Sequence, residues 1–406
     1  MSNSSQPVVL AFSGGLDTSF CVPWLKETCG RPVVTVTVNT GGIDAAEAEA
    51  LAEKSAALGA GDHILVEARG DFFDQVLKYL IMGNVRRGQM YPLCVGAERG
   101  IQARCLAEVA RELGSGTVAH GCTAAGNDQV RFEIVLKTLA PELEVLAPVR
   151  DHAWARQDQI EYLGARGMPL PAAGSAYSIN RGLWGVTIGG TETLGSAASI
   201  PESAWVLSGG ALDEPLPSRE LTVEFRSGVP VAVDGEQLDP VSVIERLEQI
   251  GSAFGIGRGI HLGDTILGMK GRVAFEAPAA EILLTAHREL EKLTLSALQQ
   301  RIKDQVSLAY GDFIHEGKQL DPVCRDIEAL LASSQTRVTG SAHCLLRPGS
   351  VFVTGVESPH SLMAASRGQY GESAGEWTAA DAVGFSRLMA LPGLLQTRAG
   401  GGEAEG

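Results

Sequence analysis

The residues best suited to chemistry lie near the start of the chain, in the stretch VVLAFSGGLDTSF at positions 8–20. The apolar run 8–12 predicts a buried strand, and the residues from Leu16 onward predict a helix. Gly14 and Gly15 between them allow positive φ and close backbone approach, so successive amide N–H groups can face one concavity ahead of a helix N-terminus. Such a concavity binds phosphate. The polar side chains around it are Ser13, Asp17, Thr18 and Ser19.

This turn differs from two better-known phosphate-binding motifs, because the chain has neither GxGxxG nor GxxxxGK[ST] at this place. Without the motif's lysine, the loop suits a departing pyrophosphate better than transfer of a γ-phosphoryl group, which places bond cleavage at the α-phosphate. Asp17 can cap the helix or help to place a cation. A turn whose glycines serve packing alone is the alternative for this stretch by itself. Pro23 is expected to kink or shorten the helix.

Length and composition limit the class of protein. A chain of 406 residues is too long for one ordinary core and predicts two domains, with room for an oligomerisation extension. The polar start MSNSSQ and the lack of any apolar stretch of about 18 residues predict a cytoplasmic protein with no membrane partner. The formal net charge of −15 argues against a nucleic-acid partner. Seven cysteines without a CxxC pair are expected to be buried thiols.

The first 150 residues alternate short apolar runs with amphipathic stretches, which is typical of a parallel sheet with crossover helices. Helices are predicted over 44–59, with Asp44 as the N-cap, and over 98–113, with Gly114 after the end. The predicted strands are Val8 to Phe12, Val33 to Val38, His63 to Glu67, Thr117 to His120 and Val145 to Pro148.

In such a doubly wound sheet the ligand binds beyond the carboxyl ends of the strands. The segments that follow three of the strands, SGGLDTS, NTGGID and HGCTAAGNDQVRFE, are therefore expected to meet at one edge.

The pattern changes after the stretch GARGMPLPAAGSAYS at 164–178, where proline and glycine punctuate shorter elements up to about residue 218. The stretch LTVEFRSGVPVAVDGEQL predicts strands around turns at Ser227-Gly228 and Asp234-Gly235. The helices predicted beyond it are Pro240 to Ile250, Ala280 to Leu293, Asp321 to Ser333 and Ala379 to Ala390.

Longer motifs resemble a known family. SGGLDTS is the pyrophosphatase-loop signature of ATP-dependent adenylating enzymes, and VVLAFSGGLDTS with AHGCTAAGNDQVRFE at 119–133 resembles the argininosuccinate synthase family. Similar stretches follow in order along nearly the whole chain: YPL at 91–93, APVR at 147–150, AYSINRGLWG at 176–185, GIGRG at 255–259, GMKGR at 268–272, TAHRELEKLTL at 285–295 and SPHSL at 358–362.

The resemblance implies a fold and an activity. The expected fold is α/β, with a doubly wound parallel sheet of the adenine nucleotide alpha hydrolase type over residues 1–168. A second α+β synthetase and multimerisation domain is expected over 169–375, and a C-terminal oligomerisation helix with a disordered tail over 376–406. The family joins citrulline to aspartate at the expense of ATP, giving argininosuccinate, AMP and pyrophosphate through a citrullyl-adenylate, in arginine biosynthesis. A homotetramer and Mg²⁺ are expected with it.

The family's site residues are carried over by motif. No general base or covalent nucleophile is obvious, so alignment and stabilisation of phosphate charge are expected to dominate, with Asp17 and Arg99 as candidates. The positions implied for ATP are Ala11, Phe12, Ser13, Gly14, Gly15, Leu16, Asp17, Thr18, Ser19, Val38, Arg99 and Gly121. Those for aspartate are Thr123, Asn127 and Asp128. Those for citrulline are Tyr91, Gly96, Asn127, Arg131, Ser178, Thr187, Gly263 and Phe275.

The chain departs from the family in the citrulline pocket. Gly263 stands where a glutamate is expected to hold the substrate ammonium. Loss of hydrogen bonds to a charged group, each worth about 1.5–3 kcal/mol, weakens binding strongly. Either neighbours such as His261 and Asp264 compensate, or the substrate is another ureido compound whose amino group is masked, such as an acylated citrulline. The other departures are Val95 and Gly96 for Thr-Ser, Ala125 for lysine, Thr187 for serine and Phe275 for tyrosine.

Two rival classes share the phosphate-binding loop. A tRNA-modifying adenylating or thiolating enzyme predicts a basic groove and a reactive cysteine pair, whereas this chain is acidic and lacks such a pair. A nucleotide-binding protein without turnover is the third hypothesis, in which the altered pocket is a relic.

Overall fold

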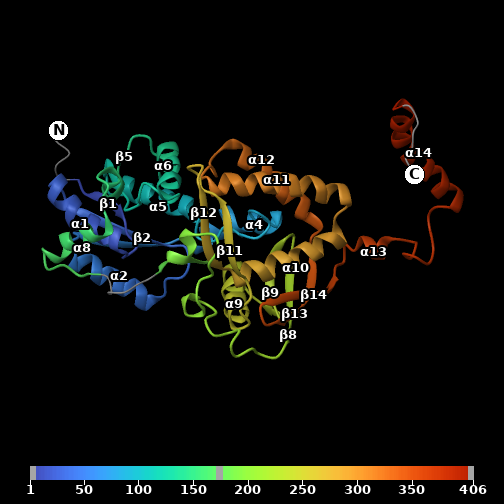
Figure 1. The fold of residues 1–406 in the computed structure, drawn as a ribbon, viewed down its shortest axis with the longest axis horizontal. Helices are drawn as coiled ribbons and strands as arrows, with labels where there is room; N and C mark the ends of the chain where they lie inside the picture. Colours follow the sequence, from blue (N-terminus) through green and yellow to red (C-terminus); the bar gives the residue numbers. More distant parts are fainter. Residues whose placement is uncertain (1–5, 171–176, 401–406) are drawn as a thin grey trace. The chain divides into compact units, whose positions relative to one another are not determined.

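The computed structural model describes residues 6–170 and 177–400. The chain divides into two compact units, Met1–Pro359 and His360–Gly406. The predicted disordered tail lies largely at 401–406, outside the described residues. The first unit combines one parallel and two antiparallel sheets (Figure 1).

The parallel sheet has the strand order β3-β2-β1-β4-β5, so the direction of winding reverses at β1 and β4. This confirms the doubly wound fold, and every predicted strand is found within two residues of its predicted ends. Its strands are β1 (Val8–Ala11), β2 (Val33–Asn39), β3 (Asp62–Glu67), β4 (Thr117–Ala119) and β5 (Glu144–Leu146).

Helices cover both faces of this sheet, because side chains of successive strand residues point to opposite sides. Val8 and Leu10 pack with α1 (Leu16–Cys29), α2 (Ala45–Ala57) and α8 (Arg156–Gly164), whereas Val9 packs with α5 (Arg99–Glu112) and α6 (Asp128–Leu139). The short helical segments of this half are α3 (Arg69–Phe72), η2 (Phe73–Leu77), α4 (Lys78–Gly83) and α7 (Pro148–Asp151).

Local signals in the sequence explain where these helices begin and end. The Asp44 side chain accepts a hydrogen bond from the Glu47 amide at 2.9 Å, as an N-cap does. Gly59 and Gly114 follow their helices with φ of 89° and 63°, a backbone conformation that favours glycine. Helix α1 runs through Pro23 to Cys29, so the expected shortening is wrong. Proline removes one hydrogen bond there, and the buried apolar face of the helix holds it in place.

The second half of the unit is α+β, as predicted. Its sheets have the orders β10-β9-β8-β13-β14 and β11-β12-β7-β6, with antiparallel pairing throughout. The strands are β6 (Ser178–Gly182), β7 (Gly185–Gly189), β8 (Arg219–Arg226), β9 (Val229–Val233), β10 (Glu236–Gln237), β11 (Arg258–Asp264), β12 (Lys270–Glu276), β13 (Gly340–Arg347) and β14 (Ser350–Glu357). The helices are η3 (Thr191–Leu194), η4 (Glu202–Ala204), α9 (Pro240–Ala253), α10 (Pro278–Thr294), α11 (Ala297–His315), α12 (Pro322–Ser334) and η5 (Gln335–Arg337).

The predicted hairpins are present. Ser227 and Gly228 have φ of 48° and 77°, and Asp234 and Gly235 have φ of 52° and 80°, which suit tight hairpin turns. Sequence analysis missed α11, whose mostly polar sequence hides its buried face. Its capping box is a signal that could have found it: the Ser296 hydroxyl accepts from the Gln299 amide, and the Gln299 side chain accepts from the Ser296 amide.

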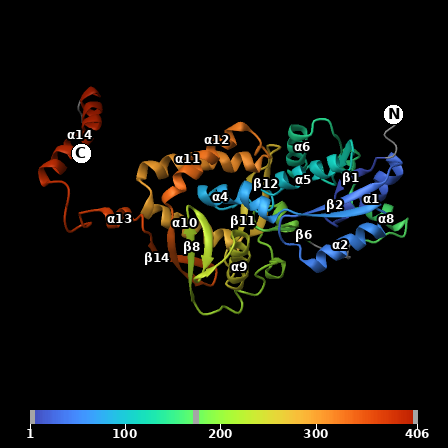
Figure 2. The ribbon, with the colours of Figure 1, turned by 180° about the vertical axis from the view of Figure 1, so that it is seen from behind.

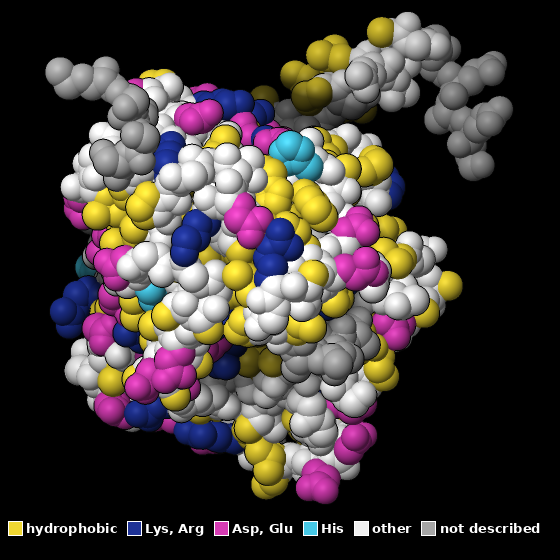
Figure 3. Space-filling view, turned by 90° about the vertical axis from the view of Figure 1, so that its left-hand side faces the viewer, with side chains coloured by type: hydrophobic (Ala, Val, Ile, Leu, Met, Phe, Trp, Pro, Cys, Tyr) yellow, Lys and Arg dark blue, Asp and Glu magenta, His cyan; other side chains and the backbone are white. Residues whose placement is uncertain are grey.

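Charged groups of both signs are interspersed on the end of the first unit that carries the parallel sheet (Figure 3). On this face the described acidic and basic side chains neighbour one another. The surface there does not present a field of one sign, so electrostatic selection of ligands must come from groups closer to the bound molecule.

The second unit contains α13 (Leu362–Ala365) and α14 (Ala379–Ala399). The Thr378 hydroxyl and the Asp381 carboxylate form a capping box at the start of α14. This helix continues past Pro392 to Ala399, so it is longer than the predicted 379–390. Its large apolar side chains are exposed, among them Phe385, Leu388, Met389 and Leu395.

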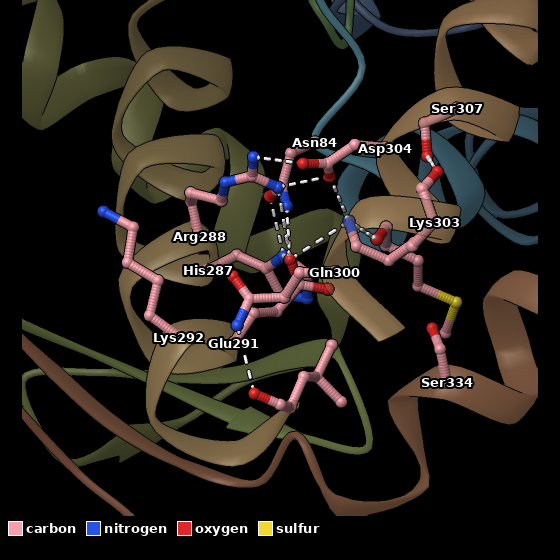
Figure 4. A network of polar contacts seen from close by, with 12 residues as sticks. Asn84, His287, Arg288, Glu291, Lys292, Gln300, Lys303, Asp304, Ser307 and Ser334 are labelled. Carbon is pink, nitrogen blue, oxygen red and sulfur yellow. Dashed lines mark hydrogen bonds and ion pairs between the residues drawn. The ribbon is translucent and has the colours of Figure 1, made fainter. Parts of the chain in front are cut away.

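A buried polar network joins α4 to α10 and α11, which lie side by side in both ribbon views (Figures 1 and 2). Lys303 and Glu291 are fully buried and point toward one another, with Nζ and Oε2 3.0 Å apart (Figure 4). The Lys303 ammonium also donates to the Met82 carbonyl at 3.0 Å, and Glu291 accepts from Asn84 and from Gln335. The buried charges of Lys303 and Glu291 are thus paired with each other and hydrogen-bonded.

We expect Lys303→Met to lower the free energy of unfolding by about 3–5 kcal/mol, because it leaves the Glu291 carboxylate buried without its cation. Urea denaturation followed by circular dichroism measures the loss. Lys292→Met on α10, the helix that carries Glu291, removes an exposed pair with Glu289 and is the matched control, with an expected loss below about 1 kcal/mol. Adding Glu291→Gln to Lys303→Met should recover part of the loss; equal losses in the two single variants would contradict the prediction.

Candidate active site

A cavity of about 850 Å³ opens where the carboxyl ends of β1, β2 and β4 meet β6, β7 and the β11–β12 hairpin. The three loops predicted to meet at one sheet edge all line it. The predicted site residues on its wall are Ala11, Phe12, Ser13, Gly15, Asp17, Thr18, Val38, Tyr91, Gly96, Arg99, Gly121, Thr123, Asn127, Asp128, Arg131, Ser178, Thr187 and Gly263. Residues from both halves of the first unit therefore build one site.

Four predicted site residues do not line this cavity: Gly14, Leu16, Ser19 and Phe275. Leu16 is buried in the core beneath the loop. The buried Ser19 hydroxyl donates to the Gly14 carbonyl at 3.4 Å, so it supports the loop from inside. Phe275 packs against Tyr91 with ring centroids 5.1 Å apart. These residues lie behind the ones that line the cavity and support them.

The glycine loop leaves the start of α1 open toward the cavity. Gly14 has φ of +70° and a Cβ there would lie 2.5 Å from the Leu51 side chain, so both conformation and space demand glycine. No described side chain caps α1 at Gly15. The first-turn amides of a 14-residue helix therefore face the region that Gly15, Asp17 and Thr18 line, which favours an anion.

A lysine reaches this loop from elsewhere in the sequence. Lys54 on α2 donates from Nζ to the Gly14 carbonyl at 2.5 Å, and partial burial lowers the pKa of its ammonium. The motif itself lacks a lysine, but the folded loop carries one on its outer side. Sequence reasoning missed Lys54 because 40 residues separate it from Gly14.

Asp128 lies between two arginines at the start of α6. Its Oδ2 accepts from Arg99 Nε at 3.0 Å, and its Oδ1 accepts from Arg131 Nη1 at 2.7 Å. Burial alone would raise the pKa of Asp128, but the two guanidinium groups hold it down to about 2. The carboxylate is therefore ionised at neutral pH and fixed in position.

Arg99 is almost fully occupied by protein acceptors. Besides Asp128, it donates to Glu98, Gln102 and Asn180 at 3.1, 2.8 and 3.2 Å. Burial raises the pKa of Glu98 to about 7, against the opposing charge of Arg99 and a hydrogen bond from Thr40 at 2.8 Å. With most of its N–H groups used, Arg99 suits a positioning role better than direct neutralisation of phosphate.

Arg131 is held by the end of α11. Its Nε donates to the His315 carbonyl at 2.8 Å and its Nη2 to His315 Nδ1 at 3.1 Å. The negative end of a helix dipole stabilises such a cation. A Cβ at Gly96 would lie 3.2 Å from Arg131 Nη2, so the loop passes close over the guanidinium. Leu93 and Val95 adopt φ of 67° and 55° in this loop, an uncommon backbone for bulky residues.

Asn127 bridges the two halves of the site. Its Oδ1 accepts from the Ile266 amide of the β11–β12 hairpin at 2.9 Å, which leaves the side-chain NH₂ for a ligand. Tyr91 donates its hydroxyl to the Cys94 carbonyl at 2.6 Å. Both side chains line the cavity while holding backbone in place.

The position where a glutamate was expected is occupied differently. A Cβ at Gly263 would lie 2.5 Å from His261 Nε2 and 3.1 Å from Arg87 Nη1, so these two side chains fill the space beside the glycine. Burial and the nearby Arg87 charge lower the pKa of His261, so the imidazole is neutral at pH 7. Asp264 pairs instead with the exposed Lys270 at 2.5 Å. Both His261 and Asp264 line the cavity, and their compensation for the missing glutamate stays a prediction.

Among residues 6–170 and 177–400, no three His, Cys, Asp or Glu side chains gather to hold a metal ion. The described helices include none that is long and apolar enough to cross a bilayer.

Comparison with known proteins agrees with the fold. Residues 7–169 match the family described as Arginosuccinate synthase N-terminal HUP domain, and residues 177–395 match the Arginosuccinate synthase C-terminal domain. The chain is 39% identical to an argininosuccinate synthase of Xanthomonas campestris, over 97% of this chain and 98% of the relative. The synthase of Dehalococcoides mccartyi is 37% identical, with 97% of both chains covered. That of Methanocaldococcus jannaschii is 38% identical, over 87% of this chain and 89% of the relative.

The parallel sheet with its open helix N-terminus defines a nucleotide-binding enzyme of the HUP class, fused to an α+β domain that completes the site. The chain belongs to the argininosuccinate synthase family, ligases that form a C–N bond with the use of ATP.

We expect Lys54→Met to raise KM for ATP about tenfold or more with a smaller effect on kcat, because the loop loses a hydrogen bond from a charged group worth about 1.5–3 kcal/mol. Steady-state kinetics at varied ATP measures this, and Lys54→Arg should restore most of the affinity. Lys26→Met is the matched control, since Lys26 Nζ donates to the Gly59 carbonyl at 3.0 Å outside the cavity. An equal KM in the two methionine variants would show that Lys54 has no role in the site.

Proposed function

We propose that this chain uses ATP to join a citrulline-type ureido compound to aspartate, releasing AMP and pyrophosphate through a ureido-adenylate. The observation that carries the proposal is the single cavity on which residues from all three predicted groups converge. With citrulline the product is argininosuccinate, an intermediate of arginine biosynthesis.

The chemistry must overcome a poor leaving group. A ureido carbon is stabilised by resonance and its oxygen does not leave readily. In the first step that oxygen attacks the α-phosphate of ATP, and the bond to pyrophosphate breaks. In the second step the aspartate amine attacks the activated carbon, loses a proton, and AMP leaves with the former ureido oxygen. Charge stabilisation and alignment supply the rate in both steps.

The glycine loop suits the outer phosphates of ATP. The open first turn of α1 supplies amide donors, and the hydroxyls of Ser13 and Thr18 lie 3.3 Å apart beside it. Gly121 supports close packing here, because a Cβ at that position would lie 3.1 Å from the Thr18 amide nitrogen. Mg²⁺, which proteins hold through one or two carboxylates and substrate phosphates, would use Asp17 and balance the phosphate charge.

The second half of the wall suits two amino-acid-like substrates. Thr123, the free NH₂ of Asn127 and the ionised Asp128 offer donors and an acceptor to aspartate. Tyr91, Arg131, Ser178 and Thr187 lie on the cavity wall where the ureido compound is expected. Citrulline is the first candidate; an N-acylated citrulline is the second, favoured by the Arg87 guanidinium beside Gly263.

Isotope labelling of the ureido oxygen tests this mechanism. With ¹⁸O in the ureido group of the substrate, we expect ¹⁸O in AMP after turnover with ATP and aspartate, detected by mass spectrometry. Pyrophosphate–ATP exchange should require the ureido compound and not aspartate. Formation of ADP, or AMP without label, would overturn the mechanism, and exchange that needs no ureido compound would point to another adenylating activity.

The assembly and setting are further parts of the proposal. Residues 1–168 and 169–375 form the nucleotide-binding and synthetase domains, and the segment 376–406 joins copies of the chain into a homotetramer in the cytoplasm. The exposed apolar side chains of α14 support this, because large exposed apolar surfaces mark interaction sites.

Truncation tests the assembly. We expect the full chain to have the mass of a tetramer by light scattering, and a chain ending at residue 375 to shift to smaller species, because it loses the apolar helix. Unchanged mass after truncation would contradict the role of α14.

A further inference from the structure

The part of the cavity wall formed by Arg87, His261 and Gly263, which we call the Gly263 notch, carries two hydrogen-bonding groups. Arg87 Nη1 lies 3.1 Å and His261 Nε2 2.5 Å from where a Cβ would stand. Arg87, His261 and Gly263 all line the cavity, and His261 lies two residues before Gly263 on β11, on the same face of the strand. The notch therefore opens into the proposed ureido pocket.

Both groups at the notch lack a hydrogen-bond acceptor among the described residues. Arg87 uses Nη2 to donate to the Asp264 carbonyl at 3.0 Å, and its Nε lies 3.5 Å from Asp312 Oδ1. Its Nη1 has no acceptor within the described parts of the chain. His261 is 9% exposed and its Nε2 is buried, likewise without a partner among the described residues. A buried polar atom without a partner is costly, and a bound acceptor relieves that cost.

The charges around the notch select against a cation. Asp264 is exposed and paired with Lys270, and Asp312, which belongs to α11, is 61% exposed and outside the cavity wall. Asp128 is occupied by Arg99 and Arg131. Asp264 is the carboxylate of the described cavity wall nearest Gly263, and Lys270 already holds it, so an ammonium group would have to compete with Lys270 and would also face the Arg87 guanidinium.

We propose, on the basis of the function given above, that the ureido substrate carries a carboxylate and no free ammonium at the end that enters the Gly263 notch. An N-acyl or a deamino form of citrulline meets this description. Its carboxylate or acyl oxygen accepts hydrogen bonds from Arg87 Nη1 and His261 Nε2. Such a site rejects an analogue that leaves its buried donors unpaired.

The experiment is pyrophosphate–ATP exchange with the purified full chain and four ureido compounds: citrulline, N-acetylcitrulline, 5-ureidopentanoate and butylurea. We expect kcat/KM for N-acetylcitrulline or 5-ureidopentanoate to exceed that for citrulline at least tenfold. Butylurea, which has no carboxylate, should be at least tenfold worse than 5-ureidopentanoate. Equal or better use of citrulline overturns the inference, as does equal use of butylurea.

Variants test the two named side chains. Arg87→Met should raise KM for the preferred carboxylate substrate about tenfold or more and reduce its advantage over citrulline. Arg86→Met is the matched control, because Arg86 pairs with Glu281 at 3.1 Å and does not line the cavity. His261→Ala combined with Gly263→Glu places a carboxylate in the notch and should shift the preference toward citrulline. Unchanged preference in both notch variants, with circular dichroism showing folded protein, overturns the inference.

The two levels of the proposal fail in different ways. If no ureido compound supports exchange, the proposed function is wrong and the inference falls with it. If exchange occurs with citrulline as the preferred compound, the proposed function stands and only the inference is overturned.

Discussion

The site depends on two backbone segments that approach each other where the winding of the sheet reverses. The first turn of α1 and the second residue after β4 pack so closely that a Cβ on Gly121 would lie 3.1 Å from the Asp17 carbonyl carbon. On the other side, Gly14 leaves room only for the Leu51 and Lys54 side chains of α2. Because no side chain intervenes, helix α1 can direct its amides at a ligand bound in the cavity.

Much of this arrangement follows from local sequence, because strand burial, caps and tight turns are decided by neighbouring residues. The continuous apolar run Val8, Val9 and Leu10 predicts a buried strand, and the structure covers it on both faces. Asp44 and Gly59 mark the limits of α2. Pro23 misled the prediction, since it removes one hydrogen bond without ending α1, and α14 likewise continues past Pro392. Helix α11 was not predicted because one of its faces is buried by tertiary packing that its polar composition does not suggest.

The chemistry of the site was less accessible from sequence, because its electrostatics come from distant segments. Lys54 reaches the glycine loop across 40 residues, and Arg87 meets Gly263 across more than 170. Motif matching identified Gly263 as a missing carboxylate but not what replaces it. Only the folded chain shows a guanidinium and a neutral imidazole at that place.

The bond between Arg131 and the last turn of α11 has a consequence for how this protein can be divided. Arg131 belongs to the segment matched by the HUP family, while the His315 carbonyl that fixes its guanidinium belongs to the C-terminal family segment. The two segments match separate family domains, yet both contribute residues to the same cavity. An isolated nucleotide-binding half would lose both hydrogen bonds from its arginine to His315 and keep the one to Asp128, so chimaeras between relatives must exchange α6 and α11 together.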